Sequence, residues 1–190
     1  MTDTLNVTPL AVDEWDTSLD GILKDMRGRP LNVHKLLANH PALLGAWWNI
    51  RNHAVNGGEL EQRHRELIIL RVAVHMKSWY EWASHVERGL KVGLSIDEIE
   101  RVRQGEIEKG WDIADALILL ATDECFLKRK VSAGTRKRMR GLFTSAQLLD
   151  LVAIYGVYVI LGTMINTWGL ELDDFIELPP EESEDTWLQI

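Results

Sequence analysis

The sequence predicts an all-α fold, and three observations lead to this prediction. Valine and isoleucine residues recur at spacings of three and four, as on a helix face, instead of alternating as in a strand. No pair of alternating apolar runs joined by a tight turn, the signal of a β-hairpin, is present. Residues that begin or end helices are frequent along the chain. With 190 residues, 46% of them hydrophobic, the chain can also bury a sizeable core.

The first three long helices are predicted from their start and stop residues. Pro41 occupies a first helical position, and its helix ends at the glycine pair 57–58. The next helix is expected over 59–76, with four apolar residues on one stripe: Leu60, Leu67, Leu70 and Val74. A third begins at Ser78, because Ser78 and Glu81 have the spacing of a capping box.

The second half of the chain has the same kind of punctuation. Ser95 opens another capping box, Asp112 opens a long helix, and Thr144 opens a third box that leads into an apolar helix over 146–166. The basic stretch 128–140 is expected to be a solvated turn between helices. Together these signals predict about eight or nine helices.

We expect a single all-α domain over 1–176, followed by an acidic tail over 177–190. Eight acidic residues and no lysine or arginine lie between 171 and 190, which leaves 21 acidic and 21 basic residues elsewhere. A neutral body with an acidic tail offers no electrostatic surface for nucleic acid or an anionic membrane, so neither is predicted as a partner.

Location and redox chemistry follow from three further features. The first ten residues lack the basic start and apolar run of a signal peptide, so we expect a cytoplasmic protein. The single cysteine, Cys125, excludes an intrachain disulfide and a cysteine-rich zinc site. The uncharged stretch 151–170 is long enough to span a bilayer, but its polar residues and acidic flanks favour a buried core helix.

The same apolar stretch predicts self-association. Ala153, Gly156, Ile160 and Thr163 share one helix face, where small residues allow another helix to approach closely. This face exposes more apolar surface than one small domain readily covers, so we expect an oligomer.

The candidate catalytic residues are Glu66, Glu81 and His85. Glu81 precedes His85 by four residues, which places both on one helix face, and Glu66 lies on the preceding helix. Two carboxylates and an imidazole between two helices can transfer protons. Two alternatives remain open: Glu81 simply caps its helix, or Glu66 forms an exposed ion pair with a neighbouring arginine. Two ligands are too few for a metal, so no metal site is predicted.

Three groups of residues resemble one family. They are Arg65–Ala73 (RELIILRVA), Tyr80-Glu81-Trp82-x-x-His85, and Gly93-Leu94-Ser95-x-x-Glu98-Ile99. The chain resembles the carboxymuconolactone decarboxylase family, which includes the alkylhydroperoxidase D-like proteins, over about 30–172. The resemblance implies an alkylhydroperoxidase D-like helical bundle that assembles as trimers or hexamers, with the active site near a subunit boundary.

The peroxidase branch of this family carries a Glu, a Cys-x-x-Cys pair and a His. Glu66 and His85 match the first and last of these residues, whereas Ser78 and Glu81 stand where the two cysteines would be. A hydroxyl and a carboxylate cannot form a disulfide, so thiol peroxidase chemistry is disfavoured.

The decarboxylase branch places a Glu four residues before the His, as Glu81 stands before His85. The resemblance therefore implies a cofactor-independent lyase that uses Glu66, Glu81 and His85 as its catalytic residues on a small cyclic or carboxylated substrate. Substrate-binding residues are expected next to them: Ser78, Trp79, Tyr80 and Trp82. Two rivals remain, a peroxidase-like antioxidant protein that uses Cys125 and a catalytically silent oligomer that binds small molecules. A buried Glu81 would favour the enzyme, whereas a Glu81 turned outward onto Ser78 would favour the silent protein.

Overall fold

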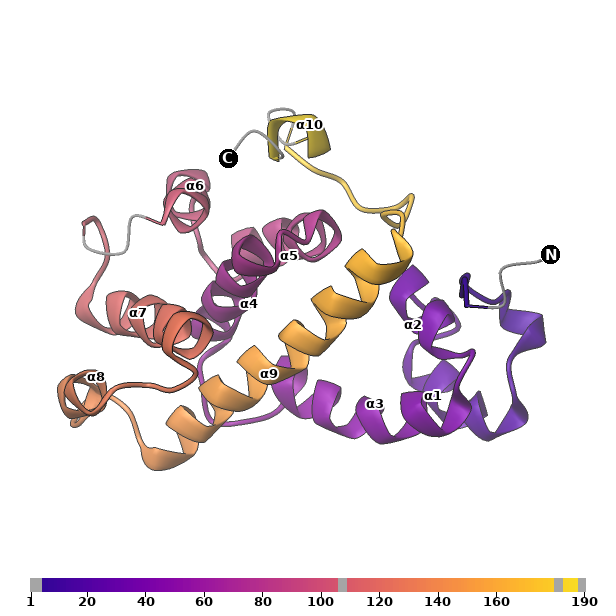
Figure 1. Cartoon of the computed structure of the whole chain (residues 1–190), viewed down its shortest axis with the longest axis horizontal. Helices are drawn as coiled ribbons and strands as arrows, with labels where there is room; N and C mark the ends of the chain where they lie inside the picture. Colours follow the sequence, from indigo (N-terminus) through magenta and orange to yellow (C-terminus); the bar gives the residue numbers. More distant parts are fainter. Residues whose placement is uncertain (1–4, 106–108, 180–182, 188–190) are drawn as a thin grey trace.

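The helix-forming sequence patterns account for the longer helices of this computed structural model, which describes residues 5–105, 109–179 and 183–187. Helices are the only regular elements in these ranges, as the spacing of apolar residues predicts (Figure 1). Two short 3-10 turns, Val12–Glu14 and Thr17–Leu19, precede the α-helices. The α-helices are α1 (Asp20–Asp25), α2 (Asn32–Leu37), α3 (Pro41–Asn56), α4 (Gln62–Met76), α5 (Trp79–Lys91), α6 (Ile96–Gln104), α7 (Ile113–Lys128), α8 (Ala133–Met139), α9 (Ser145–Trp168) and α10 (Glu184–Trp187).

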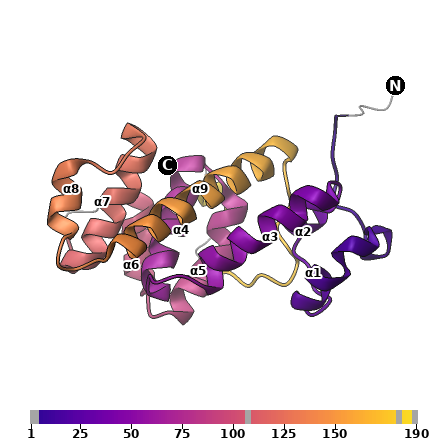
Figure 2. The same ribbon diagram turned by 90° about the horizontal axis from the view of Figure 1, so that it is seen from below.

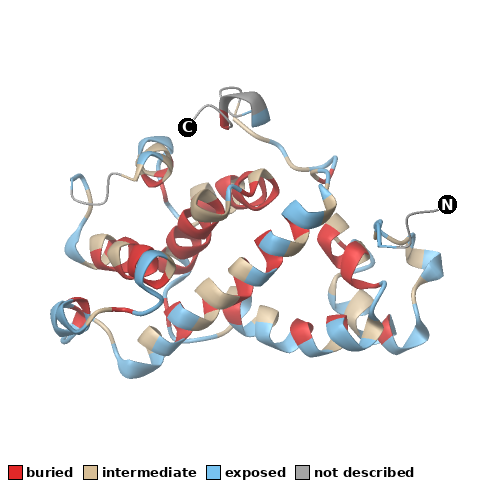
Figure 3. Cartoon of the chain, viewed as in Figure 1, coloured by how far each residue is buried: buried red, intermediate tan, exposed pale blue. Residues whose placement is uncertain are grey.

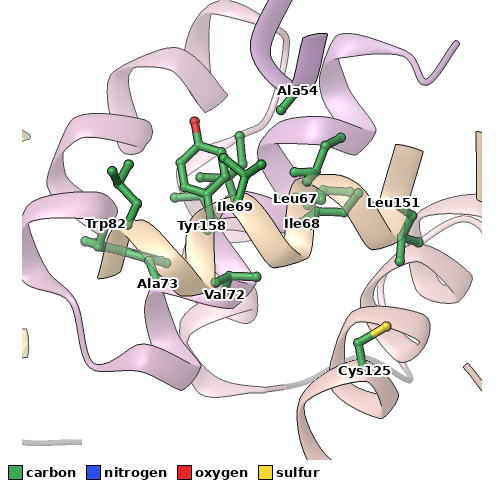
Figure 4. Close-up of a cluster of buried hydrophobic side chains, with 14 of the residues drawn as sticks. Ala54, Leu67, Ile68, Ile69, Val72, Ala73, Trp82, Cys125, Leu151 and Tyr158 are labelled. Atoms are coloured by element: carbon green, nitrogen blue, oxygen red, sulfur yellow. The ribbon is translucent and has the colours of Figure 1, made fainter. Parts of the chain in front are cut away.

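Helix α4 lies at the centre of the fold. It packs against α5, α6, α7 and α9, and its residues from His64 to Ala73 are all buried. Leu67 and Leu70 of the predicted stripe are buried and Val74 is partly buried, but the buried surface of α4 is wider than this stripe because several helices pack on it (Figure 3). Figure 4 shows its aliphatic side chains beside Trp82 of α5 and Tyr158 of α9. A central helix that carries polar residues must pair them internally or hold them for chemistry.

Most predicted helix boundaries are confirmed. The capping boxes at Ser95 and Thr144 both form, and α3 begins at Pro41. The box at Ser78 does not form, because no side-chain hydrogen bond caps α5. The basic stretch 128–140 is not a simple turn, because it contains α8.

Helix α9 crosses the whole bundle and contacts α3, α4 and α7 (Figures 1 and 2). One face is buried in these contacts, while Leu149, Val152, Ile160 and Thr163 on the opposite side are exposed. By length and composition α9 is apolar enough to cross a membrane. One such helix is weak support for a span, since the core helices of bundles have the same character.

The chain after α9 returns to cover α5. Asp173 accepts a 2.5 Å hydrogen bond from the Tyr80 hydroxyl and a 2.9 Å bond from the backbone N–H of Asn32. Trp187 of α10 is 6% exposed, and its ring lies 4.8 Å from the ring of Trp82. The described part of the acidic tail therefore ends on an apolar anchor.

Candidate functional site

Glu66 of α4 and His85 of α5 form a buried pair at the centre of the site. Glu66 Oε2 lies 2.6 Å from His85 Nδ1, and the two residues are 8% and 4% exposed. A carboxylate can only accept a hydrogen bond, so Nδ1 carries the proton of the ring. The lone pair of the neutral ring is then on Nε2. The sequence predicted that these two residues converge, and its alternative of an exposed Glu66 ion pair is wrong.

Tyr158 of α9 completes this group and was not predicted from the sequence. Its hydroxyl lies 3.2 Å from His85 Nε2, and the two rings meet edge to face at 5.1 Å. Burial raises the pKa of Tyr158 above its ordinary value, so the phenol stays protonated and donates to Nε2. A polar ring on the buried side of an apolar helix was the only signal of its role.

Glu81 lies one turn before His85 and is 1% exposed. Within the described residues, neither carboxylate oxygen has a hydrogen-bond partner at bonding distance. Gly162 of α9 makes room for this side chain, because a Cβ there would lie 2.6 Å from Glu81 Oε2. Glu81 therefore points into the bundle and does not cap its helix.

Burial shifts the pKa values of Glu81 and His85 in opposite directions. It raises the pKa of Glu81 well above the ordinary value, and the nearby Ser78 hydroxyl offsets this only slightly. It lowers the pKa of His85, although Glu66 opposes the shift, and the positive charge of Arg88 lowers this pKa further. The site thus favours a neutral carboxylic acid beside a neutral imidazole, which are the states that a general acid and a general base need.

These groups line a small cavity of about 30 Å³, enough for one or two water molecules. Its polar lining residues come from α2, α3, α5 and α9: His34, Arg51, Tyr80, Glu81, Ser84, His85, Arg88 and Tyr158. His34 Nδ1 accepts a hydrogen bond from the Leu31 N–H, and burial lowers the pKa of His34 to about 3. His34 is therefore a neutral wall of the cavity with its ring proton on Nε2.

The predicted substrate-binding residues lie in different places. Tyr80 lines the cavity, but Asp173 accepts the hydrogen bond from its hydroxyl. Trp82 is fully buried and packs against Trp187, while Trp79 lines a separate cavity of about 470 Å³ beside α10. Ser78 is fully buried at the start of α5. Of the four, only Tyr80 lines the cavity that also contains Glu81 and His85.

The arrangement of side chains supports neither a metal site nor thiol chemistry in the described part of the chain. Among the described residues, no group of three or more His, Cys, Asp or Glu side chains is placed to hold a metal ion. Cys125 is buried in α7 and does not line the cavity. Burial and the charge of Glu124 raise the pKa of Cys125 to about 11, so its thiolate is disfavoured at neutral pH.

One known family matches the middle of the chain. Residues 41–123 match the model of the carboxymuconolactone decarboxylase family. The matched segment contains Glu66, Glu81 and His85, while Tyr158 lies beyond it. No curated protein matches the chain.

Solved structures of the same fold extend over nearly the whole chain. A cysteine-to-alanine variant of the debrominase Bmp8, in complex with 2,3,4-tribromopyrrole, is 11% identical with a TM-score of 0.75, covering 99% of this chain and 97% of its own. A peroxidase-related protein from Silicibacter sp. TM1040 is 18% identical with a TM-score of 0.73, covering 93% and 97%. An alkylhydroperoxidase AhpD core protein from Ralstonia eutropha JMP134 is 20% identical with a TM-score of 0.71, covering 87% of each chain. These likenesses confirm the predicted alkylhydroperoxidase D-like fold.

Proposed function

We propose that this protein is a cofactor-independent acid–base enzyme, of the decarboxylase-like lyase type, that acts on a small cyclic or carboxylated organic compound. The family match supports an enzyme-like function at a coarse level, decarboxylase-like or peroxidase-like. The observation that carries the finer proposal is the opposite shift in the pKa values of Glu81 and His85 beside one cavity. A binding protein would gain nothing from burying an unpartnered carboxyl group at a cost of several kcal/mol.

In this mechanism His85 is the base and Glu81 the acid. His85 Nε2 takes a proton from solvent in the cavity, and the carboxylate of Glu66 stabilises the imidazolium that forms. Loss of carbon dioxide from a substrate carboxylate leaves an electron pair that a neighbouring carbonyl delocalises. The carboxylic acid of Glu81 then protonates the carbon, and His85 returns a proton to Glu81 through the shared cavity. In the resting protein the Tyr158 hydroxyl occupies the lone pair of Nε2, so this hydrogen bond must open when Nε2 takes up the proton.

A small cyclic substrate is consistent with what is bound in one solved structure of the same fold. The debrominase Bmp8 variant holds 2,3,4-tribromopyrrole, a small aromatic ring. A peroxidase-like activity would need a reactive thiol, and the one cysteine of this chain is buried with a raised pKa. We therefore rank the peroxidase function below the acid–base function.

We also propose that the protein is a cytoplasmic homotrimer or hexamer that binds neither nucleic acid nor a membrane. The exposed apolar side of α9, formed by Leu149, Val152 and Ile160, supports burial against a second copy. Light scattering should give a multiple of three subunits, and a stable monomer at micromolar concentration would contradict this.

The activity can be tested without knowing the natural substrate. Wild-type protein is incubated in D₂O with small lactones and cyclic β-keto acids, and carbon-bound deuterium and released carbon dioxide are measured. Glu81→Gln, which keeps the shape of the side chain, should lower the rate by about 10²–10⁴-fold. Cys125→Ser is the matched control and should leave the rate unchanged.

Two results would contradict the proposal. Activity that survives Glu81→Gln but disappears in Cys125→Ser would favour the peroxidase. Compounds that bind beside His85 without exchange or decarboxylation would favour the silent binding protein.

A further inference from the structure

Two arginines separate the His85 cavity from larger outer cavities. Arg51 of α3 and Arg88 of α5 line the inner cavity of about 30 Å³ and also two outer cavities of about 300 and 560 Å³. The outer cavities have the size of small-molecule binding sites, whereas the inner one does not. A substrate in either outer cavity therefore lies beside these two guanidinium groups, which also line the His85 cavity.

Neither arginine has its charge neutralised by the protein. Within the ranges that the structure describes, Arg51 donates one 3.2 Å bond to the neutral amide of Asn52 and stacks over Trp48 at 5.2 Å, and no carboxylate pairs with Arg51 or Arg88. Burial and the charge of Arg88 lower the pKa of Arg51. Two half-buried and unpaired guanidinium groups are unfavourable unless something anionic joins them.

The surroundings carry the same sign of charge. The two outer cavities are lined by five basic residues and two acidic ones, although the whole chain has a net charge of -8. The basic residues are Arg29, Arg51, Arg65, Arg88 and Lys91, and the acidic ones are Asp25 and Glu66. Met26, Leu31 and Trp48 supply apolar walls. This chemistry fits an organic carboxylate better than a bare inorganic anion.

We propose that Arg51 and Arg88 bind the carboxylate of the substrate at the entrance to the His85 cavity, and that neutralisation of their charge makes His85 a stronger base. The proposal deepens the function proposed above and rests on His85 being the base. Arginine is suited to this role because its planar guanidinium group can bind a carboxylate through two hydrogen bonds. The enzyme would then acquire its full basicity only when an anionic substrate has arrived.

The electrostatics around His85 support this coupling. The charged and titratable groups that face it come from five elements: His34 (α2), Arg51 (α3), Glu66 (α4), Glu81 and Arg88 (α5), and Tyr158 (α9). Among them only Arg51 and Arg88 are permanent cations, and both lower the pKa of His85. An anion between them opposes that effect, so the pKa of His85 rises. By linkage, protonation of His85 must strengthen anion binding equally.

Benzoate, an apolar body with one carboxylate, is a suitable probe for the intact protein. Its dissociation constant is measured by calorimetry at pH 7. The dissociation constants of benzyl alcohol, the uncharged control, and of inorganic phosphate, the bare anion, are measured in the same way. Benzoate should bind more tightly than either. Arg51→Gln and Arg88→Gln should each weaken benzoate about tenfold, the value of one charge-assisted interaction. Arg138→Gln, which removes the same charge from the exposed surface of α8, should change it less than twofold.

The coupling between anion binding and protonation of His85 is tested by measuring the pKa of His85 by NMR. The His85 signal is assigned as the one that is absent in His85→Gln. Benzoate should raise the pKa of His85, and benzyl alcohol should not. Arg88→Gln should raise this pKa without any ligand and reduce the further effect of benzoate. A purely structural arginine would not produce this pair of results, and far-UV circular dichroism checks that each variant is folded.

Several outcomes would overturn the proposal. Equal binding of benzyl alcohol would show that the carboxylate is not recognised, and equal binding of phosphate would show that the apolar body is not. A pKa of His85 that is unchanged by benzoate would refute the coupling. These measurements need no turnover, so they fail or succeed separately from the exchange assay: a site that binds benzoate in a protein without activity would refute the enzyme and leave the anion site standing.

Discussion

Helix α4 and its neighbours contain two carboxylate–histidine pairs with the same separation but different surroundings. Glu66 Oε2 lies 2.6 Å from His85 Nδ1, and Asp123 Oδ1 lies 2.6 Å from His75 Nε2. Asp123 also accepts bonds of 2.6 and 3.2 Å from Arg71, whose Nη1 donates to the carbonyl of Val102. Among the described residues no arginine forms an ion pair with Glu66, and its histidine faces a cavity.

The difference separates structure from chemistry. In the Asp123 pair, burial alone would raise the pKa of Asp123, but His75 and Arg71 hold it below its ordinary value, and His75 stacks on Phe126 at 4.4 Å. Beside the Glu66 pair, Glu81 remains buried without a partner. A satisfied network stabilises the fold, whereas an unsatisfied one is retained for function at a cost in stability.

The largest expected effect is on activity. His85→Gln should lower turnover by about 10²–10⁴-fold, because it removes the base, while His75→Gln should change turnover less than twofold. Both variants are assayed in the exchange reaction after their folding has been checked. Equal losses in the two variants would show that the pairs do not differ in function.

The next largest effect is on stability. Asp123→Ala leaves the buried Arg71 without its carboxylate and should lower the free energy of unfolding by about 3–5 kcal/mol. Glu66→Ala should cost less, about 1–3 kcal/mol, because it leaves a neutral ring with an unsatisfied donor. Urea unfolding measures both. A greater loss for Glu66→Ala would reverse the proposed assignment.

The sequence predicts contacts between residues on consecutive helices, but not contacts between residues that are far apart along the chain. The approach of Glu66 to His85 followed from two consecutive helices, and the boxes at Ser95 and Thr144 are local signals. Tyr158 lies 73 residues from His85, so its approach depends on how α9 crosses the bundle. Arg51 was missed for the same reason. The box at Ser78 was wrong because burial of Glu81 overrides its tendency to cap.

Tyr158→Phe should have a smaller effect on turnover, about tenfold, because the variant keeps the ring and loses only one hydrogen bond to Nε2. The pH profile of the rate is the sharper readout. Without the donor, His85 should titrate at a higher pH, since the hydroxyl stabilises its neutral form. An unchanged rate and profile would exclude Tyr158 from the site.

The smallest expected effect is on the pH dependence of stability, to which Glu81 and Asp123 contribute in opposite directions because their pKa values are shifted in opposite directions. The pKa of Glu81 is raised in the folded protein, so wild-type stability falls as pH rises above the ordinary glutamate value of about 4.5. Glu81→Gln should therefore be as stable as wild type near pH 4 and more stable than wild type at pH 7.

The control for that experiment is the carboxyl group with the opposite shift. The pKa of Asp123 is lowered, so its contribution to stability is present above about pH 4 and is lost as pH falls through the folded value. The deficit of Asp123→Ala should therefore shrink on acidification. Parallel pH profiles for the two variants would contradict the contrast between the regions.

The most direct test of the central claim is the protonation state of Glu81 and His85 at pH 7 in the unliganded protein. Carbon-13 and nitrogen-15 NMR reports both groups, with Glu81→Gln and His85→Gln used to assign the signals. We expect a protonated Glu81 carboxyl group and a neutral His85 that carries its proton on Nδ1. An ionised Glu81, or a His85 already charged at pH 7, would contradict the acid–base account.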